Sequence, residues 1–151
     1  MHSIMLNIKE YLDLIYDYNY ALTKIDVPYN PTTFPFDYAI GKDLDMFVSK
    51  DNFEKIQEIT LNFFKQYTRF EFIIIKNAKN FRLRMEQNGV LHYQIDITMN
   101  DTIIQNKEYR NHYYILSLNN EMKVRLNEIR KNPGKLHHRD WILSHQTCGD
   151  I

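Results

Sequence analysis

Two aspartates separated by one residue, Asp43 and Asp45, are the side chains of this sequence best suited to chemistry. They begin a run, 43–48, in which polar and apolar residues alternate as they do in a β-strand. Alternate residues of a strand face the same side, so both carboxylates are expected to project from one face. Neighbouring carboxylates repel each other unless a cation lies between them, and hard oxygen ligands suit Mg²⁺ or Mn²⁺. The pair therefore predicts a divalent-metal site.

A third carboxylate, Asp96, lies in a later run, 90–98, that also has the pattern of a strand. A sheet that brings this strand beside 43–48 would unite the three acids. Three such carboxylates can hold two divalent ions about 3.5–4 Å apart, the arrangement used for in-line phosphoryl or nucleotidyl transfer. We therefore predict that Asp43, Asp45 and Asp96 are metal ligands and catalytic residues. The alternative for the Asp-x-Asp pair is an ordinary solvated strand edge or turn.

The two acidic strands, with a helix expected between them, resemble the DNA polymerase beta-like nucleotidyltransferase superfamily. The segments that carry the resemblance are Gly41-Lys42-Asp43-Leu44-Asp45-Met46-Phe47-Val48 and Gln94-Ile95-Asp96-Ile97-Thr98. The resemblance covers roughly residues 20–98 and is closest to bacterial nucleotidyltransferase-like proteins found near polysaccharide biosynthesis functions. It implies a nucleoside triphosphate substrate, Mg²⁺ or Mn²⁺ as cofactor, and a role in surface polysaccharide biosynthesis.

One element of the family pattern is missing. Family members usually carry a Gly-Ser pair on a short upstream helix, where it contacts the triphosphate. The corresponding region here, residues 21–24, has no such pair. Thr23 and Lys24 are the candidates to replace it, through a hydroxyl group and a cation that reach phosphate.

Four further residues are candidates for binding the nucleotide phosphates. Gly41 has no side chain and lets a phosphate approach the backbone closely. Lys42 either contacts phosphate or only relieves the repulsion between the neighbouring acids. Lys135 and Arg139 belong to a late basic segment that, by family analogy, faces the phosphates. The alternative for that segment is a solvated helix start with Trp141 in the core.

Several other polar residues favour structural roles. Arg82 and Arg84 share one face of a predicted strand, and an exposed sheet face is preferred to an anion site there. His137 and His138 are expected on different helix faces and predict no zinc site. Cys148 lies close to the C-terminus and is a poor candidate for a nucleophile.

Hydrophobic periodicity and turn residues predict an α+β domain with a mixed sheet flanked by helices. We interpret residues 1–151 as a single nucleotidyltransferase-like domain, with a core at about 20–98 and a helical part at about 119–146. Asn88-Gly89 predicts a tight hairpin turn. The expected helices are 3–18, 49–67 (after Ser49 as N-cap), one around 122–129, and 136–144; the expected strands are 36–40, 43–48, 70–75, 81–86 and 90–98.

Composition narrows the class of partner. Lys plus Arg and Asp plus Glu number 19 each, so nucleic acid is not favoured as a ligand. One cysteine cannot form an internal disulfide, and no apolar run approaches the roughly 18 residues that a membrane helix needs. A cytoplasmic protein without a membrane partner is expected, and the sequence does not indicate an oligomeric state.

These observations favour a metal-dependent nucleotidyltransferase that moves a nucleotidyl group from a nucleoside triphosphate to a hydroxyl or phosphate acceptor. The rival hypothesis is a catalytically inactive domain of the same fold that binds a ligand or a protein partner, which the missing Gly-Ser pair supports. A metal-dependent nuclease would need a Glu-x-Lys-like element after the first acids, and no convincing one is present.

Overall fold

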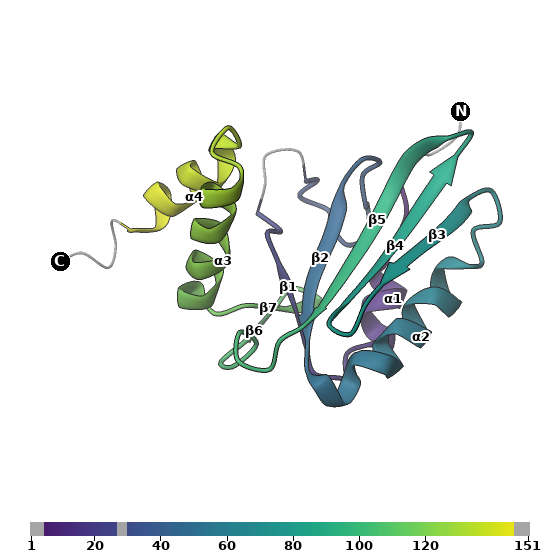
Figure 1. Cartoon of the computed structure of the whole chain (residues 1–151), viewed down its shortest axis with the longest axis horizontal. Helices are drawn as coiled ribbons and strands as arrows, with labels where there is room; N and C mark the ends of the chain where they lie inside the picture. The colour runs from purple at the N-terminus through teal and green to yellow at the C-terminus, as the bar shows by residue number, and fades with distance from the viewer. Residues whose placement is uncertain (1–4, 27–29, 147–151) are drawn as a thin grey trace.

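The β-strands form one mixed sheet that brings distant parts of the chain side by side (Figure 1). The computed structural model describes residues 5–26 and 30–146. Its strands are β1 (Tyr20–Thr23), β2 (Asp43–Val48), β3 (Glu71–Lys76), β4 (Asn80–Gln87), β5 (Val90–Met99), β6 (Glu108–Arg110) and β7 (Tyr113–Ile115). They are ordered β3-β4-β5-β2-β1-β7-β6. The pairs β2–β5 and β1–β7 are parallel and the other neighbours are antiparallel. The expected α+β class with a mixed sheet is confirmed.

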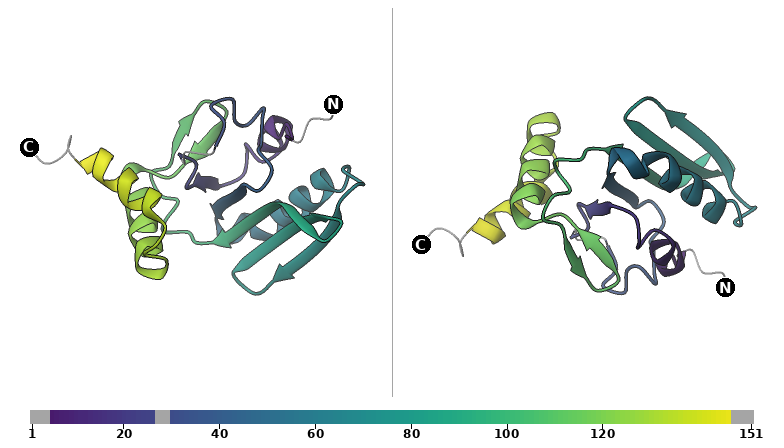
Figure 2. Two further views of the ribbon diagram at one scale, coloured as in Figure 1. Left: turned by 90° about the horizontal axis from the view of Figure 1, so that it is seen from above. Right: turned by 90° about the horizontal axis from the view of Figure 1, so that it is seen from below.

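The helices of the described residues flank this sheet in two groups. They are α1 (Lys9–Leu14), the 3₁₀ turn η1 (Lys50–Asn52), α2 (Phe53–Phe64), α3 (Leu118–Lys131) and α4 (Leu136–Gln146). The first group, α1 and α2, covers one face of the sheet, whereas α3 and α4 lie together beyond β1 and β7 (Figures 1 and 2). None of these helices has both the length and the apolar composition needed to cross a bilayer.

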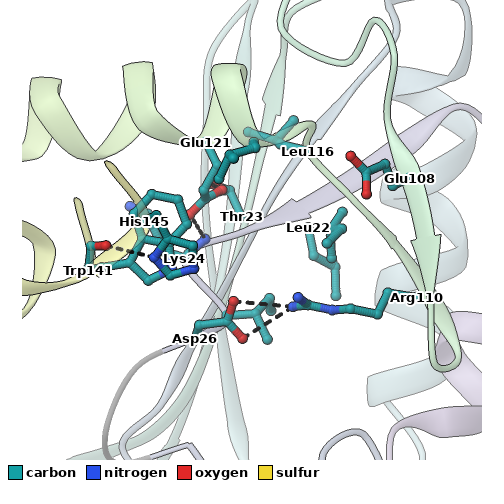
Figure 3. Close-up of a pocket in the computed structure, with 13 residues that line it drawn as sticks. Leu22, Thr23, Lys24, Asp26, Glu108, Arg110, Leu116, Glu121, Trp141 and His145 are labelled. Atoms are coloured by element: carbon teal, nitrogen blue, oxygen red, sulfur yellow. Dashed lines mark hydrogen bonds and ion pairs between the residues drawn. The ribbon is translucent and has the colours of Figure 1, made fainter. Parts of the chain in front are cut away.

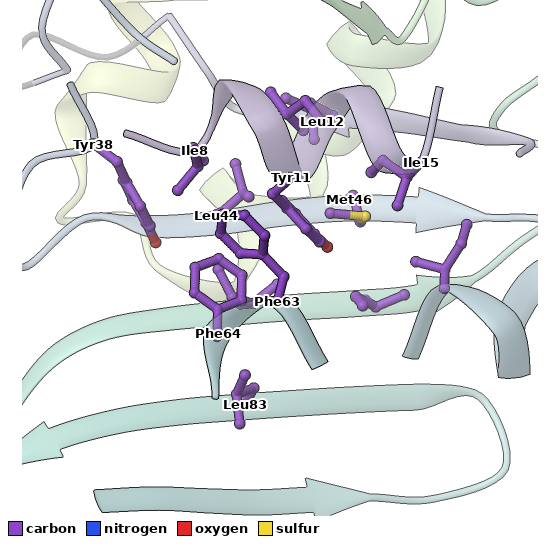
Figure 4. Close-up of a cluster of buried hydrophobic side chains, with 14 of the residues drawn as sticks. Ile8, Tyr11, Leu12, Ile15, Tyr38, Leu44, Met46, Phe63, Phe64 and Leu83 are labelled. Carbon is purple, nitrogen blue, oxygen red and sulfur yellow. The ribbon is translucent and has the colours of Figure 1, made fainter. Parts of the chain in front are cut away.

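The main hydrophobic core lies between the sheet and the helices α1 and α2. The central strands alternate, so each sends apolar side chains to this face and polar ones to the other. On β2 the buried apolar residues are Leu44, Met46 and Val48. Tyr11 of α1 packs against Phe63 and Phe64 of α2, with ring centroids 5.5 and 5.1 Å apart (Figure 4). With this face filled, the polar residues of the same strands are left on the opposite face.

The hairpin between β4 and β5 turns at Asn88 and Gly89, as the sequence predicts. Their φ angles are 54° and 77°, the left-handed values that a two-residue type I′ turn requires. Glycine and asparagine adopt this conformation more readily than other residues. The turn therefore starts the antiparallel pairing that continues along both strands.

The N-terminal segment differs from the expected helix over 3–18. Leu6 is extended and exchanges backbone hydrogen bonds with Tyr38, at N–O distances of 3.0 and 2.6 Å. The helix α1 starts only at Lys9, whose backbone N–H donates to the side chain of Asn7. The expected strand 36–40 is reduced to this single bridge. Ser3, like Cys148, lies outside the described residues.

Other boundaries differ less. Ser49 precedes the turn η1 rather than capping α2 directly, and α2 ends at Phe64, before the expected limit near residue 67. The strands expected at 43–48, 70–75, 81–86 and 90–98 are confirmed as β2 to β5. The two late helices are confirmed as α3 and α4. The strands β1, β6 and β7 are not anticipated by the sequence analysis.

Removing core volume on β4 tests this packing. Leu83 is fully buried beneath α2, so Leu83→Ala is expected to lower the free energy of unfolding by about 2–5 kcal/mol. The matched control is Ile75→Ala on the edge strand β3, where the side chain is 51% exposed and the expected loss is below about 1 kcal/mol. Urea unfolding measures both, and equal losses would contradict the assignment of the core.

Candidate functional site

Three carboxylates on two neighbouring strands face one pocket. The parallel register of β2 and β5 sets Asp45 beside Asp96, and Asp43 beside Gln94. Because paired residues of neighbouring strands share a face, all three acids project to the side opposite α1 and α2. They line a cavity of about 470 Å³, which we call the acid pocket. The three predicted acids therefore do converge, although they are separated by about 50 residues of sequence.

The remaining lining of the acid pocket is mostly basic and comes from several regions that are distant in the sequence. It consists of Lys24, Lys42, Arg82, Gln94, Glu128, Lys135, His137 and His138.

Asp96 is held by two donors. The Nε of Arg82 lies 2.8 Å from Oδ1, and the amide of Gln94 donates to Oδ2 at 3.0 Å. Arg82 stands directly opposite Asp96 in the β4–β5 ladder. The sheet face expected to be exposed at Arg82 is open, since 41% of the side chain is exposed, and the guanidinium also lines the acid pocket. Arg84 differs, since it pairs with Glu86 at 3.3 Å and does not line the pocket.

A β-bulge sets this pairing of Arg82 with Asp96. The register between β4 and β5 shifts by one residue beyond the turn and leaves His92 as the extra residue of β5. The carbonyl oxygen of His92 accepts a hydrogen bond from the backbone N–H of Gly41 at 2.7 Å. The bulge therefore also ties β5 to the turn that leads into β2.

Lys24 neutralises Asp45 from the other side. It directly follows β1 with a φ of 56°, and its Nζ lies 3.4 Å from Asp45 Oδ2 and 3.1 Å from Glu128 Oε1. Burial lowers the pKa of Lys24, but the carboxylates of Asp45 and Glu128 more than offset this, so the pKa lies above the ordinary value. Lys24 thus joins the sheet to α3 as a charged side chain.

Lys42 is a buried base next to the acids. Its side chain is among the buried polar groups, and its Nζ donates to the backbone carbonyl of Asp43. Burial lowers the pKa of Lys42, against the opposing effect of Asp45 and Asp43. A positive charge here lies close enough to the acids to balance them and to meet an anionic ligand in the pocket.

Two of the acids, Asp43 and Asp45, are held in an environment that disfavours their charge. Burial raises the pKa of Asp43, and repulsion from Asp96 raises it further. Burial also raises the pKa of Asp45, where the attraction of Lys24 is insufficient to cancel it. Only 20% of the Asp45 side chain and 14% of the Asp96 side chain are exposed. A cation bound between the acids would offset their mutual repulsion and stabilise their charged forms.

Thr23 turns away from the acid pocket and anchors α3 instead. Its hydroxyl donates to Glu121 Oε1 at 2.7 Å, and the same carboxylate accepts from the N–H of Lys24 and from Arg125. Arg125 is 1% exposed, and its guanidinium lies 4.6 Å from the ring centroid of Trp141. Thr23 therefore positions the helical pair, and its predicted contact with phosphate is not supported by where its hydroxyl points.

The other candidate residues divide in the same way. Lys135 lines the acid pocket, whereas Arg139 is exposed on α4 and is not among the lining residues. Gly41 has a φ of 84° in the turn before β2 and does not line the pocket either. His137 and His138 both line it, with ring centroids 4.0 Å apart, so the expectation that they diverge is wrong. Burial and neighbouring cations lower the pKa of His138 to about 4, so it is neutral at pH 7.

The three carboxylates share one face of the sheet, and carboxylate oxygens are ligands that suit a hard divalent ion. Asp45 and Asp96 are paired with cations, and no group of three His, Cys, Asp or Glu within residues 5–26 and 30–146 is arranged to hold a metal ion. The pocket lining contains four carboxylates and four Lys or Arg side chains. A metal ion would have to replace the ion pairs of Asp45 and Asp96.

Arg82, Gln94 and Glu128 are site residues that the sequence analysis missed. Gln94 is two residues before Asp96 on the same strand, so the alternation of β5 could have placed it in the pocket. Arg82 could have been placed beside Asp96 from the apolar pattern of the β4–β5 hairpin, because that pattern requires a bulge. Glu128 reaches the pocket from α3, and no sequence pattern links it to Lys24.

Comparisons of the chain with family models, with curated proteins and with solved structures find no match. The chemistry of the acid pocket is therefore the basis on which its function is inferred.

Asp43→Asn is expected to raise the free energy of unfolding at pH 7. The pKa of Asp43 is raised by folding, so the folded state is penalised for the charge once the pH exceeds that pKa. The penalty disappears below the ordinary aspartate value of about 3.9. The advantage of the variant should therefore shrink as the pH falls towards 3.5.

Chemical denaturation at several pH values measures this effect. The control is Asp17→Asn, an exposed position outside the pocket, where a change within about 0.5 kcal/mol is expected. An Asp43→Asn variant that is less stable than the parent at pH 7 would contradict the charge balance described here.

Proposed function

We propose that this protein is a metal-dependent nucleotidyltransferase of the polymerase beta-like type, acting in the acid pocket. The observation that carries the proposal is the β2–β5 register, which places Asp43, Asp45 and Asp96 together on one face of adjacent central strands. Asp-x-Asp on one strand with a third acid on its neighbour is also the pattern of the family that the sequence resembles. The nucleotidyltransferase-like fold assignment is part of this proposal.

The mixed charge of the pocket supports a metal–triphosphate complex as the ligand. Such a complex is itself bipolar, with a divalent cation for the carboxylates and phosphate oxygens for the bases. Lys24, Lys42 and Lys135 line the pocket together with the acids. In the absence of ligand, oppositely charged groups in one pocket pair with each other, as Lys24 does with Asp45. The same groups would separate to bind the two parts of the complex.

The chain's own residues would supply position and charge rather than covalent chemistry. The acceptor hydroxyl forms a bond to the α-phosphorus as the bond to pyrophosphate breaks, and its proton passes to solvent. Asp43, Asp45 and Asp96 would hold the metal ion, which supplies charge stabilisation at the transferring phosphoryl group. Lys24 and Lys42 would hold the triphosphate, and Arg82 with Gln94 would orient Asp96.

Removal of two acids tests the proposal. The parent protein is expected to bind nucleoside triphosphates only with Mg²⁺ or Mn²⁺ and to release pyrophosphate when an acceptor is present. In the double variant Asp43→Asn, Asp45→Asn, nucleotide affinity and the rate of pyrophosphate release should each fall by more than about 100-fold. Mutation of residues that only hydrogen-bond to metal ligands already lowers metal affinity or activity by about 10–100-fold. Calorimetry and a pyrophosphate assay measure these, with Asp17→Asn as the control. Equal binding by parent and double variant would refute the proposed site.

One observation favours the rival, a ligand-binding domain that lacks catalysis. Among the described residues no acidic cluster is arranged for a metal, and Lys24 lies where a cation would neutralise Asp45. In this second candidate Lys24 substitutes permanently for the ion. It predicts that the chain binds an anionic ligand without any divalent metal.

Lys24→Met separates the two candidates. If the acids bind metal, removing the competing ammonium should increase the affinity for Mn²⁺ severalfold, because the Asp45 carboxylate loses its ion pair. The control is Lys135→Met, which removes a charge from the same pocket without breaking an ion pair between described residues. Manganese binding is followed by electron paramagnetic resonance. No binding to either parent or Lys24→Met would favour the non-catalytic candidate.

A further inference from the structure

The two edges of the sheet differ in how well they are protected. The strand order makes β3 and β6 the outermost strands (Figure 1). β6 has only three residues, two of which are charged, and the guanidinium of Arg110 lies 3.1 Å from Asp26 (Figure 3). β3 has six residues, Glu71-Phe72-Ile73-Ile74-Ile75-Lys76, and carries charge only at its two ends. Short and charged edge strands resist pairing with another chain, so β6 is protected and β3 is not.

The backbone of β3 presents hydrogen-bonding groups along its outer side. The N–H of Asn77 donates to the carbonyl of Asn80 at 2.9 Å and closes the turn into β4. Hydrogen-bonded pairs alternate along an antiparallel ladder, and this ladder continues without a bulge. The odd-numbered residues of β3 therefore bond to β4. Its even-numbered residues, Phe72, Ile74 and Lys76, direct their N–H and C=O groups away from the sheet.

The side chains of β3 are apolar on both faces of the sheet. Phe72 and Ile74 lie on the face that α2 covers, because they pair with buried residues of β4. Ile73 and Ile75 lie on the open face, where they pair with arginines of β4. The side chains of Ile74 and Ile75 are 44% and 51% exposed. The solvated face of an antiparallel sheet usually carries polar residues, so isoleucines on the open face favour a partner that covers them.

A groove lies between this edge strand and α2. It has a volume of about 590 Å³, and its apolar lining is Leu61 of α2, Ile74 of β3 and Phe81 of β4. The remaining lining is polar and consists of Asp51, Glu54, Lys55, Gln57, Glu58 and Lys76. A groove beside an unpaired edge accepts an added strand, whose alternate side chains enter the groove. The occupant that fits is therefore an extended segment with an apolar side chain.

The flank of α2 above this groove is acidic at one end and basic at the other. Glu54, Glu58, Leu61 and Lys65 follow each other at spacings of three or four residues, so they share one side of the helix. A second copy of α2 that runs in the opposite direction sets Lys65 against the two glutamates and Leu61 against its own copy. The flank is thus complementary to itself under a two-fold axis.

We propose that two copies of this chain form a dimer by antiparallel pairing of their β3 strands, which joins the two sheets into one. In a two-fold dimer the same patch of both copies forms the interface. With the axis at Ile74, this residue pairs with Ile74 of the second copy, and Phe72 pairs with Lys76 of the second copy. The outward-pointing backbone groups then meet each other. This proposal is independent of the proposed nucleotidyltransferase function.

This register matches the side chains on both faces of the joined sheet. On the open face Ile73 pairs with Ile75 of the second copy, and the isoleucines of both copies form one apolar cluster. On the other face the ring of Phe72 enters the groove of the second copy, which Lys76 and Phe81 line. A register centred one residue earlier would set a glutamate against an isoleucine. The apolar run between the two charged ends is therefore complementary to itself.

Sedimentation velocity tests for the dimer. The full chain is measured from micromolar to millimolar concentration, and we expect monomer at the lowest concentrations and dimer at the highest. Ile74→Lys should be monomeric throughout, because it sets two like charges directly opposite each other. The control is Val90→Lys, which adds the same charge at a 58% exposed strand position away from β3 and should leave the dimer unchanged. Circular dichroism checks that both variants are folded.

Cross-linking tests the register. Cys148 is the one cysteine of the chain, so the variants also carry Cys148→Ser. Under mild oxidation Ile74→Cys should form a disulfide between two copies, because directly opposite residues of a ladder have Cα atoms about 5.5 Å apart, within the range of a disulfide. Ile75→Cys is the matched control, since it lies diagonal to its own copy and should not form the bond. An equal mixture of Ile73→Cys and Ile75→Cys chains should form it.

The proposal is overturned if the parent chain is monomeric throughout, if it grows into assemblies larger than a dimer, or if Ile74→Lys dimerises as the parent does. It is also overturned if Ile75→Cys alone cross-links more readily than Ile74→Cys. A parent chain that stays monomeric but binds a foreign extended peptide at β3 assigns this edge to that partner instead. These outcomes are independent of metal and nucleotide binding in the acid pocket.

Discussion

The parallel pairing of β2 with β5 is the constraint on which the site depends, because it fixes Asp45 beside Asp96 in the middle of the sheet. Two carboxylates at adjacent ladder positions repel, and each is mostly buried. The flanking strands supply the compensation. Arg82 from β4 pairs with Asp96, and Lys24 from the end of β1 pairs with Asp45. Across four consecutive strands the charges therefore run basic, acidic, acidic, basic.

Part of this arrangement could be derived from the sequence, including a feature that the sequence analysis overlooked. In β4 and β5 the buried apolar residues have odd numbers, among them Leu83 and Ile95. A two-residue turn at Asn88-Gly89 alone would pair odd with even positions and set Arg82 opposite Ile95. The apolar pattern therefore requires one extra residue, and the bulge at His92 provides it. With this extra residue, Arg82 pairs with Asp96.

The rest could not be derived from local patterns. The strand β1 has four residues, all buried, so it shows no alternation that identifies a strand. Its position between β2 and β7 depends on contacts about 25 and 90 residues away in sequence. The contact of Lys24 with Glu128 spans a similar distance, between a strand end and a helix whose own residues are mostly polar. The helices α3 and α4 were anticipated as elements, but their place at the site depends on the buried pair of Arg125 and Glu121.

The low exposure of Asp45 and Asp96 argues against the alternative that the acids lie at a solvated strand edge. At a solvated edge a carboxylate is hydrated and needs no partner, whereas Asp45 and Asp96 lie on central strands with little exposure. Burial and mutual repulsion raise the pKa values of Asp43 and Asp45, so their charges oppose folding at neutral pH. Groups that lower stability and still occupy a cavity are typical of functional sites. An ordinary polar face would hold its charges where water solvates them.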